Sequence, residues 1–266
     1  MLRRLLHKIV PPENSLPLAI TGLMNLIAFS GPKLLQVLGW SLPMHDMTAA
    51  FDRAFPFSPV WVFVYVAAFP FWIYQYSVVA KESRSLCYRL VAADFAAKVI
   101  CLLFFVLLPT HNVRPPLETG GFTGWAMRTI WLLDTPTNLF PSIHCFVSWL
   151  GTRYIYECRS LRHRGLTCTL CTVGSVLVFL ATMFTKQHVF YDVIGGVAVA
   201  FACKDAVENL ISGFIIVFNK PFRVGDFIAV GELSGTVEDI AVRSTTLRAL
   251  DGSRYVLPNT TLTNQS

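Results

Sequence analysis

The segment Leu166–Phe184, LTCTLCTVGSVLVFLATMF, is the clearest indication of fold class because it runs for 19 residues without a charged side chain. A helix that crosses a bilayer needs about 20 predominantly apolar residues. The sequence contains further apolar stretches that predict helices of the same kind. The fourth and sixth stretches along the chain are short, so a helix there must include flanking residues to cross the bilayer. The other stretches are Leu16–Leu38, Val60–Ala80, Leu90–Leu108, Ile143–Tyr156 and Val189–Cys203. We therefore expect six transmembrane helices.

The composition agrees with an integral membrane protein. Charged residues make up only 14% of the 266 residues and apolar types 54%, whereas an ordinary soluble domain has about 25% charged residues. The formal net charge is +6, from 22 basic and 16 acidic side chains. These basic residues are scattered between apolar runs, which argues against a nucleic-acid partner. The composition also argues against a soluble enzyme and a disordered protein.

The distribution of Lys and Arg predicts how the chain is oriented. Basic residues gather near the N-terminus, in the second connection around Lys81–Arg89 and in the fourth around Arg153–Arg164. The alternate connections carry fewer, and short basic connections remain cytoplasmic. We expect a multi-pass protein of the cell membrane, plasma or inner, with both termini in the cytoplasm. The connection Pro109–Pro141 and the turn near Lys186 then face outward.

The seven cysteines lie in or beside apolar runs, which does not resemble a secreted disulfide framework. Cys168 and Cys171 form a C-x-x-C without a second pair at zinc-ligand spacing. We interpret them as helix-packing residues, with a redox or metal role as the alternative. Asp94 and Lys98 are four residues apart inside the third stretch, and we interpret them as a self-paired ion couple with Lys98 reaching toward the membrane surface.

Polar residues with the chemistry of phosphoryl transfer cluster in the outward-facing connections. His188 and Asp192 are one helical turn apart, so a carboxylate can orient the imidazole of a nucleophile. His144, at the start of the fourth stretch, can act as general acid. Cations and donors for a phosphate are Arg114, Lys186, Ser142 and Asn138.

Two other interpretations of this cluster remain open. A single interfacial histidine is usually a hydrogen-bonded polar residue, and the spacing H-x-x-x-D is common by chance. Two histidines and one aspartate could also hold zinc, although the neighbouring Arg114 and Lys186 repel a metal ion and attract an anion. We expect no bound metal and no cofactor.

Residues 15–200 resemble the type 2 phosphatidic acid phosphatase superfamily, in particular its inositol phosphorylceramide synthase-like branch. The resemblance is carried by Arg114-Pro115, by Asn138-Leu-Phe-Pro-Ser-Ile-His144 and by Lys186-Gln-His188 through Asp192. It implies a six-helix membrane core, with His188 as nucleophile, Asp192 orienting it and His144 as general acid. It also implies Arg114 as a phosphate ligand and Ser142 as a supporting donor.

The sequence departs from that superfamily at three positions. Leu107 stands where a lysine is usual, Ile143 where glycine is usual, and Thr182 where arginine is usual. Two phosphate-binding cations are therefore missing, and Lys186 is the candidate replacement. The departures put phosphate-binding strength in doubt more than the nucleophile.

The character of the chain changes after Ala202. Residues 203–218 predict an amphipathic helix, and Asp251-Gly252 predicts a hairpin turn within a small β module. The predicted strands have alternating polar and apolar residues. They lie near Phe227–Val230, Gly235–Ile240, Ser244–Arg248 and Tyr255–Leu257.

Residues 203–266 resemble the small-conductance mechanosensitive channel family, at the cytoplasmic end of its pore helix and in its β domain. The resemblance is carried by the following motifs: Asn209-Leu-Ile-Ser-Gly213, Pro221-Phe-Arg-Val-Gly-Asp226, Gly235-Thr-Val-Glu-Asp239, Ser244-Thr-Thr-Leu-Arg248 and Pro258-Asn259. We therefore expect two domains, a membrane domain at 1–202 and a truncated channel-like segment at 203–266, joined within Gly195–Lys204. Residues 203–266 could also mediate a homo-oligomer.

Our favoured interpretation is a metal-independent lipid phosphatase or phosphotransferase of the outer leaflet, acting through a phosphohistidine. Its partners would be membrane lipids and a lipid phosphate substrate, with water or an alcohol as acceptor. The alternatives are a mechanosensitive channel, suggested by residues 203–266, and an inactive chimera of the two families.

Overall fold

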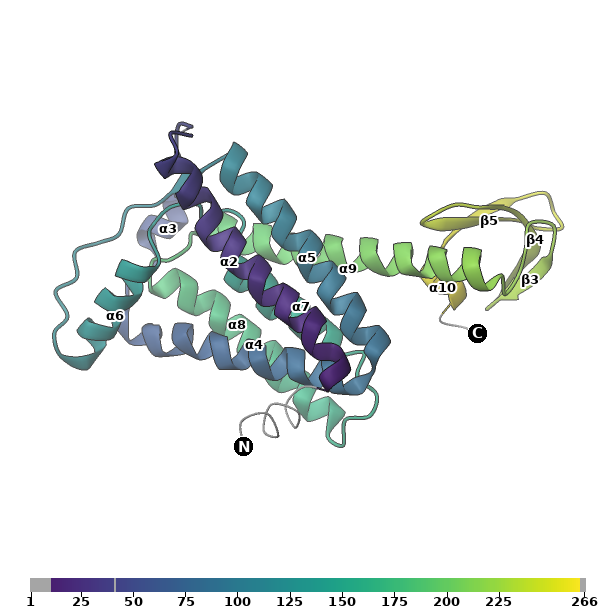
Figure 1. Ribbon diagram of the computed structural model, residues 1–266, viewed down its shortest axis with the longest axis horizontal. Coiled ribbons are helices and arrows are strands. Elements are labelled where there is room, and N and C mark those ends of the chain that lie inside the picture. Colours follow the sequence, from purple (N-terminus) through teal and green to yellow (C-terminus); the bar gives the residue numbers. More distant parts are fainter. Residues whose placement is uncertain (1–10, 41, 264–266) are drawn as a thin grey trace. The chain divides into compact units, whose positions relative to one another are not determined.

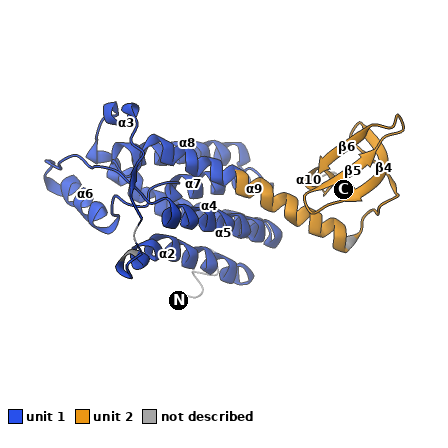
Figure 2. Ribbon diagram, turned by 90° about the horizontal axis from the view of Figure 1, so that it is seen from above, with its two compact units in different colours: residues 1–201 blue, residues 202–266 orange. Residues whose placement is uncertain are grey.

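The computed structural model describes residues 11–40 and 42–263 and divides into two compact units, Met1–Phe201 and Ala202–Ser266 (Figure 2). The division lies one residue before the boundary that the sequence predicts. What each part does is a separate question.

Unit 1 is helical. Four segments of its described residues are long and apolar enough to cross a membrane, where six were predicted. They are Pro12–Leu35, Pro59–Glu82, Arg84–Leu107 and Arg164–Phe184. Their helices are α2 (Ser15–Val37), α4 (Val62–Glu82), α5 (Arg84–Leu107) and α8 (Arg164–Phe184). The predicted mainly helical membrane protein with a small C-terminal β module is confirmed at this level.

Helix α7 (Ile143–Ile155) is the predicted fourth span, and its 13 residues are too few. At a rise of about 1.5 Å per residue it extends roughly 20 Å, against about 30 Å of hydrocarbon. It packs against α4, α5 and α8 (Figure 1), and most of its side chains are buried. The apolar character of α7 therefore reflects burial in protein.

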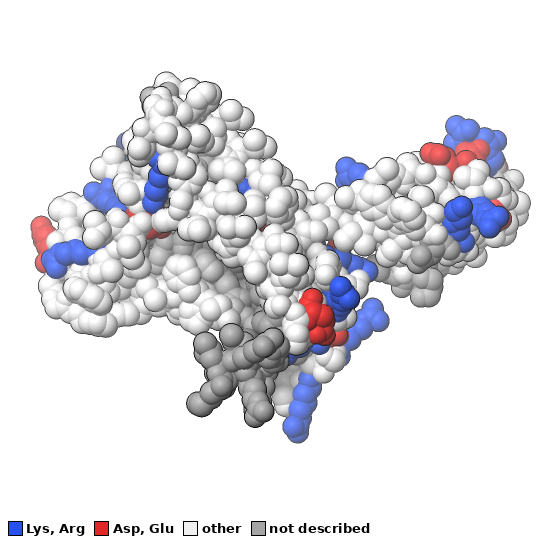
Figure 3. All heavy atoms as spheres, in the orientation of Figure 1, with Lys and Arg blue, Asp and Glu red and all other residues white. Residues whose placement is uncertain are grey.

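Two basic connections lie at one end of unit 1. The α4–α5 junction falls at Ser83, and the Glu82 carboxylate accepts hydrogen bonds from the backbone N–H of Arg159 (2.9 Å) and of Ser160. This contact brings the two connections together at the same end. Figure 3 shows the visible face of unit 1 largely free of charge between its ends, as expected of a surface that contacts lipid.

The predicted ion couple of Asp94 and Lys98 forms, but Lys98 does not reach the membrane surface. Lys98 Nζ donates to Asp94 Oδ2 at 2.6 Å and to the Thr21 carbonyl of α2 at 3.0 Å. The hydroxyl of Tyr76 in α4 donates to Asp94 Oδ1 at 2.7 Å. All three side chains are buried. The pair therefore joins α2, α4 and α5 inside the unit, because Lys98 finds its hydrogen-bond acceptors on neighbouring buried groups.

Shorter elements connect the helices of unit 1. They are η1 (Pro12–Asn14), β1 (His45–Asp46), α3 (Ala50–Ala54), η2 (Pro59–Trp61), β2 (Thr110–His111) and α6 (Gly121–Leu133). The two short strands pair in parallel. Helix α6 lies in the connection that the sequence treats only as an outward-facing segment.

Unit 2 contains the second half of α9 (Phe190–Asn219), an antiparallel sheet and the short helix α10 (Asn259–Thr263). The sheet has the order β3-β4-β5-β6. Its strands are β3 (Phe227–Val230), β4 (Leu233–Ile240), β5 (Ser244–Arg248) and β6 (Arg254–Pro258). The turn before β6 is at Asp251-Gly252, where Gly252 has φ +86° and Asp251 Oδ1 accepts from Ser253 N–H at 2.9 Å.

The seven cysteines are buried and outside disulfide bonds within the described residues, and Cys168 and Cys171 lie within α8. Within residues 11–40 and 42–263 no cluster of three or more His, Cys, Asp or Glu is arranged to hold a metal ion.

Candidate functional site

The predicted pair His188 and Asp192 meets at the N-terminus of α9. His188 Nδ1 lies 3.2 Å from Asp192 Oδ2, and the same oxygen accepts from Val189 N–H at 3.0 Å. Asp192 thus caps the first turn of the helix while it orients the imidazole. Both side chains are buried, and Asp192 Oδ1 has no hydrogen-bond partner among the described residues.

His144 is in the first turn of α7, next to His188, with ring centroids 5.7 Å apart. Ser142 is the N-cap of this helix, its hydroxyl accepting from Cys145 N–H at 3.4 Å and its backbone N–H donating to Asp192 O at 3.0 Å. The His144 ring packs against Tyr65 (4.5 Å between centroids) and Trp72 (5.3 Å) of α4. Its Nε2 is buried, and no residue in the described part of the chain forms a hydrogen bond with it. The N-termini of α7 and α9 therefore bring both histidines to one place.

Arg114 joins the same region through Gln187. Its Nη2 donates to Gln187 Oε1 and to Asp134 O (2.6 Å), and its Nη1 donates to Trp131 O at 3.1 Å. Burial lowers the pKa of Arg114, and the negative charge of Asp134 opposes that effect. The guanidinium is thus mostly committed to protein acceptors, while its Nε is buried without a partner within residues 11–40 and 42–263.

Lys186 is not aimed at the histidines. Its Nζ donates to Phe55 O at 2.6 Å and to Asp52 O at 2.8 Å, at α3. Burial lowers its pKa, and Asp52 opposes the shift. The ammonium therefore holds α3 to the turn before α9, so the structure does not bring it into the cluster.

Asn138 lies in the loop before α7, with φ +59°. Its backbone N–H donates to Thr110 O at 2.7 Å, and its Oδ1 is buried with no partner in the part of the chain that the structure describes.

Sequence reasoning gave no role to two residues that complete this cluster. Tyr65 donates its hydroxyl to Asp134 Oδ2 at 2.7 Å, and Gln187 links Arg114 to the turn that carries His188. A tyrosine inside an apolar span and a glutamine between Lys186 and His188 were the available signals. The cluster holds two imidazoles and a carboxylate, of which His188 and Asp192 are in contact, and the Arg114 guanidinium is linked to it through Gln187. The individual catalytic and phosphate-binding roles stay predictions.

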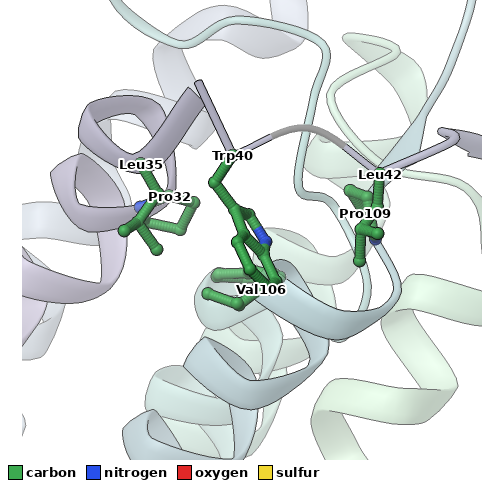
Figure 4. A pocket seen from close by; sticks show the side chains of 7 residues that line it. Pro32, Leu35, Trp40, Leu42, Val106 and Pro109 are labelled. Atoms are coloured by element: carbon green, nitrogen blue, oxygen red, sulfur yellow. The ribbon is translucent and has the colours of Figure 1, made fainter. Parts of the chain in front are cut away.

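A hollow elsewhere in unit 1 carries no comparable chemistry. It lies between α2, α5 and the segments that follow them, where Trp40 extends toward Val106 (Figure 4). Its lining, which includes Pro32, Leu42 and Pro109, is apolar.

A second polar site joins α9 to the sheet in unit 2. Buried Asn259 donates Nδ2 to Ala241 O (2.9 Å) and Val242 O (3.1 Å), and its Oδ1 accepts from the Thr245 hydroxyl at 2.9 Å. Gly213 of α9 lies so close to this loop that an added Cβ would stand 2.1 Å from Val242 O. A side chain at Gly213 would therefore separate the helix from the loop.

Further along the same contact, Asn209 and Ser212 of α9 reach α10. Asn209 Oδ1 accepts from the Thr260 hydroxyl at 3.1 Å, and the hydroxyls of Thr263 and Ser212 lie 3.0 Å apart. We call Asn209, Ser212, Gly213, Val242 and Asn259 the helix–sheet joint.

Residues 205–266 match the family described as the β-domain of mechanosensitive ion channels. Among curated proteins, the large-conductance mechanosensitive channel MscMJLR of Methanocaldococcus jannaschii is 50% identical over 72 residues, covering 27% of this chain and 20% of that protein. A small-conductance mechanosensitive channel of Helicobacter pylori is 33% identical over 103 residues, covering 38% of each chain. The chain thus spans well under half of the length of these relatives.

Among solved structures, Arabidopsis thaliana MSL1 A320V is similar at 21% identity and a TM-score of 0.27, over 71% of this chain and 60% of that chain. The closed-state MscS of Helicobacter pylori is 27% identical with a TM-score of 0.25, over 44% of this chain and 50% of that one. At these TM-scores neither likeness supports a statement about how this chain is arranged.

These matches overturn the favoured interpretation from the sequence. The predicted lipid phosphatase or phosphotransferase is wrong, because the matching family and the curated relatives are mechanosensitive channels. They give no support for a phosphatidic acid phosphatase-like segment or a lipid phosphate substrate. The misleading signal was a short set of polar residues. These residues do lie together in the structure, but their contacts also join the N-termini of α7 and α9. The part of the resemblance that holds is the second one, since residues 205–266 match the β-domain of mechanosensitive ion channels.

Proposed function

We propose that the chain is a mechanosensitive ion channel of the MscS family in the cell membrane. The observation that carries the proposal is the match of residues 205–266 to the channel β-domain. The relatives that share this segment are themselves named mechanosensitive channels. A membrane part with four candidate spans precedes it.

Helix α9 is the candidate pore helix. It runs for 30 residues from Phe190 to Asn219, through the small-residue run Gly195–Ala202 and into the helix–sheet joint. A helix of that length measures about 45 Å, more than the hydrocarbon thickness of about 30 Å. Because small residues let helices approach closely, this run suits a helix that packs beside copies of itself.

Homo-oligomerisation is part of the proposal. In unit 2, one side of α9 leaves Leu210, Phe214, Val217 and Phe218 exposed. Such apolar surface marks an interaction site when it is contiguous. A second copy of the same helix would cover it.

The proposed orientation places both termini in the cytoplasm and the N-termini of α7 and α9 toward the outside. The support is the gathering of basic connections at the opposite end of unit 1, through Glu82 and the backbone of Arg159 and Ser160. The orientation can be tested with a fluorescent protein fused to the C-terminus. Fluorescence that appears only when the C-terminus has been exported from the cytoplasm would contradict this orientation.

The deciding experiment is patch recording from liposomes that contain the full-length chain. Suction is expected to open discrete currents that protein-free liposomes lack. Gly213→Ala, which pushes α9 away from Val242, should reduce the current per reconstituted protein. Gly22→Ala is the matched control because a Cβ there meets nothing within 4 Å. Silence of the unmodified chain at membrane-rupturing tension, with protein shown to be inserted, would end the proposal.

A further inference from the structure

Helix α6 exposes a continuous apolar face. Relative exposures are 68% for Phe122, 59% for Trp125, 81% for Leu132 and 63% for Leu133. At 3.6 residues per turn these side chains fall on one stripe of the helix. A helix face that meets water normally carries polar side chains. The exposed face of α6 therefore needs an apolar environment.

The polar residues on and beside this stripe have partners within the protein. Thr129 lies on the stripe, and its hydroxyl donates to Trp125 O at 2.9 Å. Arg128 lies at the edge of the stripe, and its Nη2 donates to Thr119 O at 3.2 Å. The hydroxyl therefore does not need water, and the guanidinium is placed at the margin of the apolar surface.

The opposite face of α6 is already fixed to unit 1. Met127 is fully buried. Trp131 Nε1 donates to Thr185 O at 3.2 Å, and its ring stacks on Phe57 with centroids 5.6 Å apart. The helix thus cannot turn its apolar stripe inward.

The stripe continues the lipid-facing surface of a membrane span. Phe63 in the first turn of α4 stacks on Phe122 (5.7 Å between centroids, 17° between planes), which stacks on Trp125 (5.5 Å, 19°). Val60 of η2 and Phe63 and Val66 of α4 are exposed at the same end of this span, beside which α6 lies in Figure 1. Because α4 is a candidate span beginning at Pro59, α6 is at the height of the membrane boundary.

We propose that α6 lies in the boundary between lipid headgroups and acyl chains, with Phe122, Trp125, Leu132 and Leu133 inserted into the lipid. Tryptophan and other aromatic side chains favour this layer, and amphipathic helices bind there by burying one apolar face. Arg128, at the edge of the stripe, faces the headgroups. The partner is therefore the bilayer that holds α4, and this role does not depend on channel activity.

Photo-crosslinking tests the contact. Trp125, Leu132 or Phe122 is replaced by p-benzoylphenylalanine, and the full chain is reconstituted in phosphatidylcholine–phosphatidylglycerol vesicles and irradiated. Intact-mass spectrometry should show adducts of one phospholipid for each of these variants. Ile73, exposed in the middle of α4, is the positive control, and Leu250, exposed in the turn before β6, is the negative control.

The outcomes separate the candidate occupants. Phospholipid adducts at the α6 positions and at Ile73, with none at Leu250, support the proposal. Adducts at Ile73 alone would show that α6 faces water and would overturn it. Covalent dimers at Trp125 or Leu132 in place of lipid adducts would also overturn it, because a second copy would then cover the stripe. Three α6 positions keep the test decisive if one variant fails to fold.

Discussion

Gly213 shows how one residue fixes the geometry of unit 2. Its missing side chain lets α9 approach the carbonyl of Val242, and Asn259 donates to the carbonyls of Ala241 and Val242. The same asparagine accepts from Thr245 of β5. Helix, loop and sheet therefore meet at one point, and there is no room for a methyl group.

Replacing Gly213 with alanine should lower the stability of unit 2 by about 1–3 kcal/mol, the usual cost of overpacking a tight site. The effect can be measured by thermal unfolding in detergent. The protease sensitivity of residues 202–266 is measured alongside it. The control Gly22→Ala, in an uncrowded helix position, should be neutral or stabilise by about 0.5–1 kcal/mol. Equal melting temperatures for Gly213→Ala and the unmodified chain would show that the loop yields without cost.

At the same scale, the polar cluster shows how far local sequence reaches. The pair His188 and Asp192 and the neighbouring His144 could be predicted, because helix spacing and the order of the spans place them at one end. The direction of Lys186 could not, because its acceptors Asp52 and Phe55 lie more than 130 residues earlier in the chain. Nor could the contribution of Tyr65, which reaches Asp134 across helices.

Helices in unit 1 are joined by buried polar contacts as well as by apolar packing. The Lys98 ammonium bridges α5 to α2, and the Tyr76 hydroxyl bridges α4 to Asp94. Asn14 Nδ2 donates to Ala80 O at 2.7 Å and fixes the start of α2. The sequence predicts the length of these helices well, because an apolar run measures length directly. It does not distinguish lipid from protein surroundings, which is why α7 was counted as a span.

Lys98→Met should destabilise unit 1 by about 3–5 kcal/mol, because it leaves the Asp94 carboxylate buried without its counter-charge. The double variant Asp94→Asn with Lys98→Met should be markedly more stable than the single one, since the asparagine is neutral and keeps an acceptor for Tyr76. Melting temperatures of the three purified proteins in one detergent decide this. If the double variant melts no higher than Lys98→Met, the pair does not act as a charge-compensated unit.

Over the whole molecule, two parts of unlike composition were visible from the sequence. The four strands of unit 2 follow the predicted ranges within two residues, because alternation of polar and apolar residues and the Asp251-Gly252 turn define them locally. The function was not settled by the same means. The polar cluster of unit 1 suggested an enzyme, whereas the matches of residues 205–266 are to channels.

The oligomer belongs to this largest scale, and Phe214 is its test. Phe214 is exposed on α9 beside Leu210, Val217 and Phe218, so it offers apolar surface that a second copy can cover. Native mass spectrometry of the full chain should show an oligomer, and Phe214→Glu should shift it toward the monomer by desolvating a charge at the contact. Leu250 is exposed in the turn before β6, so Leu250→Glu should leave the number of subunits in the oligomer unchanged. An interface through α9 would be contradicted if the unmodified chain were monomeric at every protein concentration. It would also be contradicted if the two variants had the same number of subunits.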